Sequence, residues 1–198
     1  GRSGVVYASA DGNAITLGEG DDQLYDGDGD DRLDGGGGDD ILTSTAGDDT
    51  LIGGVGDDTI QAFGGGAVSI SGGSGADTIQ AFGSSGVPVT IDAGEDDDAI
   101  TLNATDGSVD GGAGDDSLTT SGDLTGLTIS NIETLYTGGG LVTATVAQFE
   151  AFDTMAVGPT QLDGTVFLQA ADGGTLDLVD ELAGRSGVVT ASADGNAI

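Results

Sequence analysis

The sequence predicts an all-β fold, a right-handed parallel β-roll or β-helix solenoid. Five nonapeptides run without a break from Leu17 to Gln61, and each follows in whole or in part the pattern G-G-x-G-x-D-x-U-x, where U is a large aliphatic residue. The sixth position is always Asp and the eighth is always aliphatic. A short fixed period of this kind is the signature of an architecture in which each repeat stacks on its neighbours.

Residues 1–16 are predicted to start a repeat unit with one degenerate coil, which has Asn13 at position six and Ile15 at position eight. The segment 1–15 recurs as 184–198 with a single change, Tyr7 to Thr190, so Gly1 corresponds to Gly184. We therefore expect one full unit of a tandem array, 1–183, followed by the start of the next unit at 184–198. A duplication arising by chance is the alternative.

Residues 17–119 are predicted to form a β-roll in which successive turns lie on alternate edges, so that two nonapeptides make one coil. Turns that begin at positions 17, 35, 53, 72, 93 and 111 then share one edge, although the spacings from 53 to 72 and from 72 to 93 are longer than two nonapeptides. The other edge has well-formed turns only at Asp26 and Ser44. In each nonapeptide the last three residues should form a short strand whose aliphatic residue points inward. The expected core stripe is Leu24, Leu33, Leu42, Leu51, Ile60, Ile79, Ile100, Val109 and Leu118.

Residues 120–183 lack the aspartate turns and are predicted to continue as metal-free β-helix coils. Residues 127–136 align with residues 144–153 at an offset of 17, which places Glu133 opposite Glu150 and Leu135 opposite Phe152. Two more β-prone pieces follow, GTVFLQ from residue 164 and GTLDLV from residue 174. The alternative is a small globular insertion with a helix over residues 146–152.

The composition restricts the possible ligands. The net charge is −32, from 35 acidic and 3 basic residues, so the chain lacks the basic footprint that nucleic acids and anionic membranes require. His and Cys are absent, which disfavours zinc and copper. Glycine-rich turns let backbone carbonyls converge, and Asp adds hard anionic oxygens, a ligand set that suits Ca²⁺ better than Mg²⁺. No apolar run is long enough to cross a bilayer as a helix, so no transmembrane segment is expected.

No catalytic centre is expected, and we interpret the chain as a protein that is not an enzyme. It has no His, Lys or Cys to act as a nucleophile or base. Paired carboxylates recur on every turn, which indicates an array of equivalent sites. An EF-hand reading of residues 26–37 fails because the twelfth position holds Gly37 where a bidentate Glu is required.

The nonapeptides resemble those of the RTX family of secreted bacterial proteins, over roughly Ala8–Thr119. The resemblance implies Ca²⁺ between successive turns of one edge, about six ions per 183-residue unit. It pairs each position-six Asp with the next one on its edge. The implied side-chain ligands are Asp22, Asp40, Asp58, Asp77, Asp98 and Asp116 on one edge, and Asp31 and Asp49 on the other. The implied turn backbone is Gly18, Gly20, Gly27, Gly29, Gly36, Gly38, Gly47, Gly54, Gly56, Gly73, Gly75, Gly94, Gly112 and Gly114.

The sequence is also similar to the surface-layer proteins, giant adhesins and extracellular filaments within that family. This similarity implies a structural protein of the bacterial cell surface, in which tandem units self-associate head to tail along one calcium-stiffened solenoid. The alternative is a calcium-binding secretion or carrier module of a secreted enzyme, toxin or adhesin.

Overall fold

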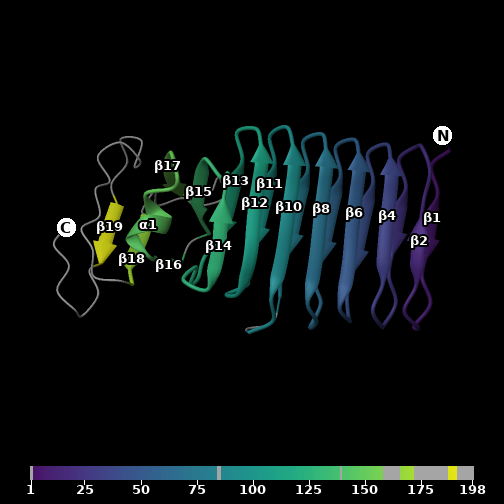
Figure 1. Cartoon of the computed structure of the whole chain (residues 1–198), viewed down its shortest axis with the longest axis horizontal. Coiled ribbons are helices and arrows are strands. Elements are labelled where there is room, and N and C mark those ends of the chain that lie inside the picture. Colours follow the sequence, from purple (N-terminus) through teal and green to yellow (C-terminus); the bar gives the residue numbers. More distant parts are fainter. Residues whose placement is uncertain (1, 84–85, 139, 158–165, 172–186, 191–198) are drawn as a thin grey trace.

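The computed structural model describes residues 2–83, 86–138, 140–157, 166–171 and 187–190. The chain winds into a parallel solenoid whose coils follow one another along the long axis of the molecule (Figure 1). The strands of the two main sheets alternate along the sequence, because each coil contributes one strand to each sheet. The predicted all-β parallel solenoid is therefore confirmed.

The odd-numbered strands from β1 to β17 form a nine-stranded sheet that we call sheet A. The even-numbered strands from β2 to β14 form a seven-stranded sheet, sheet B. Sheet A contains β1 (Val5–Tyr7), β3 (Gln23–Tyr25), β5 (Ile41–Ser44), β7 (Thr59–Ala62), β9 (Thr78–Ala81), β11 (Ala99–Leu102), β13 (Ser117–Thr120), β15 (Thr134–Thr137) and β17 (Thr154–Val157). Sheet B contains β2 (Ala14–Thr16), β4 (Arg32–Gly37), β6 (Asp49–Val55), β8 (Val68–Ser74), β10 (Val89–Glu95), β12 (Gly107–Ala113) and β14 (Leu127–Ser130).

The core is a column of aliphatic side chains on the inner face of each sheet. The strand register places aliphatic residues of successive coils beside one another, for example Leu42 beside Ile60 in sheet A and Leu33 beside Leu51 in sheet B. Side chains alternate between the two faces of a strand, so one aliphatic residue per short strand is enough to fill the narrow interior. Every residue of the predicted core stripe is buried, as the sequence predicted: Leu24, Leu33, Leu42, Leu51, Ile60, Ile79, Ile100, Val109 and Leu118.

The expected three-residue strands are too short for sheet B. Its strands β4 to β12 have six or seven residues, because each runs on into the glycine-rich start of the following turn. There the register aligns Gly36 with Gly54 and Gly54 with Gly73. Glycines carry no side chain, so the backbones of successive coils can stay close through the turn itself. The turn is thereby held to its neighbours by the same parallel ladder as the strand.

The solenoid continues past the last aspartate turn, but with a different period from the expected one. Leu135 of β15 pairs with Met155 of β17, so the offset is 20 and the alignment at an offset of 17 is wrong. The difference arises because this coil includes a short helix, α1 (Val146–Phe149). A helix was part of the alternative interpretation, yet β17 still extends sheet A, so the segment is not a separate globular insertion. This helix is far too short to cross a membrane, and the described residues contain no other.

A third sheet includes a strand from the second copy of the opening sequence. It contains β16 (Leu141–Ala144), β18 (Val166–Ala170) and β19 (Gly187–Thr190), all parallel. Strand β19 lies in the second copy of the segment that contains β1, and it aligns Val188 with Phe167 of β18. The β-prone piece GTLDLV lies outside the described residues.

Candidate metal centres

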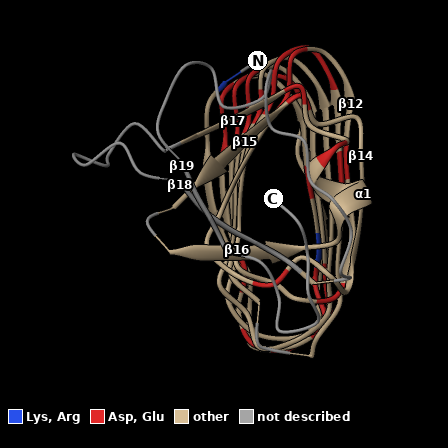
Figure 2. Ribbon diagram, turned by 90° about the vertical axis from the view of Figure 1, so that its left-hand side faces the viewer, with Lys and Arg blue, Asp and Glu red and all other residues tan. Residues whose placement is uncertain are grey.

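Two columns of turns connect the sheets, and we call them the first and second edges. The first edge joins sheet B to sheet A and contains residues 17–22, 35–40, 53–58, 72–77, 93–98 and 111–116. The second edge joins sheet A to sheet B and contains residues 26–31 and 44–49. Seen along the solenoid, acidic residues gather most densely around one bend of the coil, and others lie at the opposite bend (Figure 2). Both edges present a carboxylate at position six of each of these turns.

The position-six aspartates of the first edge form a continuous ladder. From Asp40 onward, each Oδ1 accepts a hydrogen bond from the backbone N–H of the aspartate one coil earlier. These bonds stack the predicted pairs directly on one another. The N–H to Oδ1 distances are 2.7 Å for Asp22 to Asp40, 2.7 Å for Asp40 to Asp58, 2.8 Å for Asp58 to Asp77, 2.7 Å for Asp77 to Asp98 and 2.8 Å for Asp98 to Asp116.

The second oxygen of these carboxylates is buried and has no partner within the described protein. Asp40, Asp58, Asp77, Asp98 and Asp116 are each at most 2 % exposed, and the Oδ2 of each makes no hydrogen bond. Burying an anionic oxygen without a partner is costly, so such groups are normally paired or bound to a metal. The ladder therefore presents a row of buried carboxylate oxygens whose negative charge a bound cation would compensate.

In four first-edge turns the residue at position one is a glycine that keeps space open beside that oxygen: Gly35, Gly53, Gly72 and Gly111. A Cβ on Gly53 would meet both Asp58 Oδ2 and, at 2.6 Å, the carbonyl oxygen of Gly72 on the next coil. A Cβ on Gly35 would likewise meet Asp40 Oδ2 and, at 2.8 Å, the carbonyl oxygen of Gly53. Each space is thus lined by a carboxylate oxygen of one coil and a carbonyl oxygen of the next, and we call it a cradle. This is the hard oxygen donor set that Ca²⁺ prefers, so the residues fit the ion that the sequence predicted.

Most of the glycines at positions two and four have a left-handed backbone, which glycine adopts more readily than other residues. Twelve of the fourteen predicted turn glycines have positive φ, and the exceptions are Gly18 and Gly27. Where the fifth turn of the first edge has Asp96 in place of glycine, the residue still adopts a φ of 77°. Asp is among the few residues that visit this region, so the turn keeps its shape.

The two irregular spacings do not disturb the ladder. The hydrogen bonds from Asp58 to Asp77 and from Asp77 to Asp98 match those across regular coils. The strands that flank these turns also stay in register, with Ile60 beside Ile79 and Ile79 beside Ile100. The additional residues lie in the second-edge loops between β7 and β8 and between β9 and β10. Insertions are tolerated there because those loops have no position-six aspartate ladder to break.

On the second edge the structure adds a residue that sequence reasoning missed. The N–H of Asp31 donates to Asp49 Oδ1 at 3.0 Å, which brings the predicted pair together. Asp26 joins them, and carboxylate oxygens of all three lie within 4.8 Å of one another. Asp31 Oδ2 is unpartnered, whereas Asp49 Oδ2 accepts a 2.5 Å bond from the hydroxyl of Ser44. The available signal was that Asp26 stands at position one, where the pattern calls for glycine.

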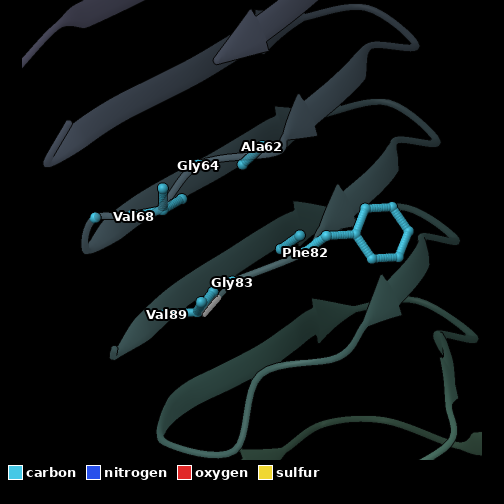
Figure 3. A pocket seen from close by; sticks show the side chains of 8 residues that line it. Ala62, Gly64, Val68, Phe82, Gly83 and Val89 are labelled. Atoms are coloured by element: carbon cyan, nitrogen blue, oxygen red, sulfur yellow. The ribbon is translucent and has the colours of Figure 1, made fainter. Parts of the chain in front are cut away.

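Further along the second edge the carboxylates give way to apolar side chains. A narrow pocket there is lined by Ala62, Val68, Ala81 and Val89 together with glycines, and the ring of Phe82 points away from Val89 (Figure 3). This lining offers no side-chain oxygen to a metal. The stretch of the second edge that pairs two aspartates is therefore short, as the degenerate turns predicted.

A second aspartate ladder runs beside the first and was also missed. The position-five aspartates bond toward the next coil, the reverse of the position-six direction. The N–H of Asp39 donates to Asp21 Oδ1 at 3.2 Å, and the N–H of Asp57 donates to Asp39 Oδ1 at 3.0 Å. These side chains are exposed, so they join neighbouring turns without forming the buried cradle. The recurring Asp-Asp doublet at positions five and six was the signal in the sequence.

Burial makes the ionised ladder unfavourable without a cation. It raises the pKa of Asp58 to about 6, of Asp77 to about 7 and of Asp98 to about 6, against an ordinary value of 3.8. Loss of hydration is the largest cause, and the backbone hydrogen bond to each carboxylate opposes it. Neighbouring carboxylates add repulsion, for example Asp58 acting on Asp77.

The comparison with known families agrees with this geometry. Residues 7–42, 43–66 and 64–81 match the family model "RTX calcium-binding nonapeptide repeat (4 copies)". Neither a curated protein nor a solved structure matches the chain. The turns at residues 93–98 and 111–116 lie beyond the matched residues, yet they carry the same aspartate ladder.

Proposed function

The chain is an RTX-repeat protein, and we propose that it is a non-catalytic structural protein of the bacterial cell exterior. In this proposal its tandem 183-residue units form a calcium-stiffened fibre or surface layer. RTX repeats bind calcium and their proteins are typically secreted. The observation that carries the proposal is the unbroken column of buried carboxylates along the solenoid axis.

Such a column would make the stiffness of the solenoid depend on the bound calcium ions. Parallel strands lie about 4.8 Å apart, so the position-six carboxylates are stacked at roughly that spacing and repel one another. Oxygens from two neighbouring coils line each cradle. A cation bound there is attracted to both coils at once, which opposes their separation. Folding and calcium binding should therefore be one event.

The repeated opening sequence supports stacking of one unit on the next. Strand β1 pairs with β3 of its own unit through Val5 and Val6. Its later copy, β19, pairs with β18 through Val188 and Val189. One strand sequence thus has partners on both sides, as a continuous head-to-tail solenoid requires. With about ten coils, a unit would extend the solenoid by roughly 50 Å.

The alternative function is a carrier or secretion module for an attached enzyme, toxin or adhesin. The compact block of matched repeats at residues 7–81 would suit a module of that kind. The duplicated opening segment favours the fibre, because a fibre requires many equivalent units. The number of units in the full gene separates the two: many copies support a fibre, and a single copy beside a catalytic domain supports a module.

The test of the structural role combines folding with assembly. Circular dichroism of the chain in millimolar calcium should show β structure that is largely lost in excess chelator. Identical spectra in the two conditions would contradict ion-dependent folding. A protein of several tandem units should then show, by electron microscopy in calcium, an axial repeat equal to the length of one unit. Images with no such repeat would argue against the fibre.

A further inference from the structure

We propose that Glu133 completes one more calcium site, at the end of the first edge between the coils of Asp116 and Glu133. This inference rests on the proposed calcium binding and extends it to a coil that has no glycine–aspartate turn. Glu133 lies beyond the residues matched by the repeat family, and it is not among the ligands implied by the nonapeptide pattern.

The cradle beyond Asp116 has the same construction as the earlier cradles of this edge. Asp116 is 1 % exposed, and its Oδ2 has no hydrogen-bond partner. A Cβ on Gly111 would lie 2.6 Å from that oxygen and would also meet the carbonyl oxygen of Asn131 on the next coil. Gly35 and Gly53 face the same pair of oxygens in their own coils. The ladder therefore leaves one more unsatisfied carboxylate oxygen, facing the coil of Glu133.

Glu133 occupies the place of a position-six aspartate. Its Oε2 accepts the N–H of Asp116 at 2.7 Å, just as Asp116 Oδ1 accepts the N–H of Asp98 at 2.8 Å. The strands that follow confirm the register, because Ser117 pairs with Thr134. A carboxylate is thus presented to the Asp116 coil by the residue one coil further on.

A shorter turn explains why this ligand is a glutamate. Asp110 pairs with Ser130 before the turn, an offset of 20, and Ser117 pairs with Thr134 after it, an offset of 17. The turn is therefore shorter than the one before it, and the glycine loop is lost. The additional methylene of Glu lets its carboxylate reach from a tighter turn. Asn131 helps to form that turn, with a φ of 51° and a 2.7 Å bond from its Nδ2 to Asp110 Oδ1.

The row of sites stops at this coil. Thr154 pairs with Thr134, so Asp153 stands at the place that corresponds to Glu133 one coil later. Its side chain is exposed, whereas that of Glu133 is half-buried. The Glu133 site also lacks a second glycine loop to supply carbonyls. Calcium affinity depends on the number and charge of the ligands, so this site should fill last.

The test counts calcium ions bound to the chain by native mass spectrometry and isothermal titration. Glu133→Gln keeps an oxygen that can accept the Asp116 N–H but removes the negative charge. We expect it to bind one calcium ion fewer than the wild type. Asp153→Asn makes the same charge change at the corresponding place of the next coil and should leave the count unchanged. An equal count in the wild type and the Glu133→Gln variant would overturn the proposal.

A measurement on the wild-type protein makes the test independent of how the variant folds. In crystals grown with terbium in place of calcium, anomalous difference density should lie between Asp116 and Glu133. Density at the earlier cradles but none there would refute the Glu133 site and leave calcium binding intact. Absence of density at every cradle would instead refute the calcium-binding function itself.

Discussion

The coils of residues 17–119 and those of residues 120–157 share one parallel ladder but fill their bends in different ways. In the earlier coils, position six of each first-edge turn from Asp40 onward is a buried carboxylate with one unpartnered oxygen. In the later coils, the interior is filled by Phe149, Phe152 and Met155, each at most 1 % exposed. Both regions stack through the same parallel strand pairing. Stacking alone therefore does not determine which residues occupy a bend.

The later coils satisfy their own polar groups to a greater extent. Helix α1 begins with a capping box, in which Thr145 and Gln148 bond to each other's backbone N–H. The side-chain amide of Gln148 also donates to the carbonyls of Leu124 at 2.6 Å and Leu127 at 2.9 Å. Within the described residues, six buried Oδ2 oxygens of the acidic coils have no such internal partner: those of Asp31, Asp40, Asp58, Asp77, Asp98 and Asp116. The stability of one region should therefore depend on an ion in solution, and that of the other should not.

The largest expected difference between the regions comes from filling one cradle. In Gly72→Ala, the new Cβ would collide with Asp77 Oδ2 and with the carbonyl oxygen of Ala93. Both contacts would be shorter than a Cβ normally makes, so the turn has to shift to admit the new side chain. We expect the free energy of unfolding in saturating calcium to fall by about 3 kcal/mol, in the range of severe overpacking. Denaturant titration measures this loss.

The matched change in the later region is Gly122→Ala. No atom lies within 4 Å of the Cβ position at Gly122, so its effect should stay within about 0.5 kcal/mol. Equal losses in the two variants would show that the first edge is not more tightly constrained than the later coils.

A smaller effect should appear on changing pH, with opposite signs with and without calcium. Burial holds the pKa values of Asp58, Asp77 and Asp98 between about 6 and 7, above the unfolded value of 3.8. The metal-free fold therefore favours protonated carboxyls. Its stability should rise as the pH falls from about 7 towards 4, and should be lost as the pH rises again. With calcium bound the trend should reverse, because protons compete with the ion for the same oxygens.

Circular dichroism at pH 7.5 and pH 5, in metal-free buffer and in millimolar calcium, measures both trends as the amount of folded β structure. Hydrogen exchange should place the change in the strands between β5 and β13. The described carboxyls with raised pKa values all lie within residues 26–116: Asp26, Asp40, Asp58, Asp77, Asp98 and Asp116. Parallel pH trends with and without calcium would contradict the coupling.

The two regions also differ in how far the sequence could predict them. In the acidic coils the strict period determines both strand register and ligand pairing, and the insertions that appeared to interrupt it lie in the opposite loops. The missed residues, Asp26 and Glu133, break the pattern and are brought to a site only by the stacking of coils. In the later coils no strong period exists. The true offset of 20 depends on α1, whose short capping box gives little signal against a β-rich background.

The smallest effect concerns an unpartnered group in the later coils. Thr137 is 1 % exposed, and its Oγ1 makes no hydrogen bond to the described residues. Unlike a carboxylate, a neutral hydroxyl offers little to a cation, so calcium should not relieve its cost. Thr137→Val removes the polar atom at nearly constant shape and should stabilise the chain by about 1 kcal/mol, equally with and without excess calcium. Thr119 lies on the adjacent strand, where it pairs with Tyr136, and it is half-buried. It provides the control, because Thr119→Val makes the same change there and should have a smaller effect. If Thr137→Val is stabilising only in one calcium condition, the later coils also depend on the ion and the contrast between the two regions fails.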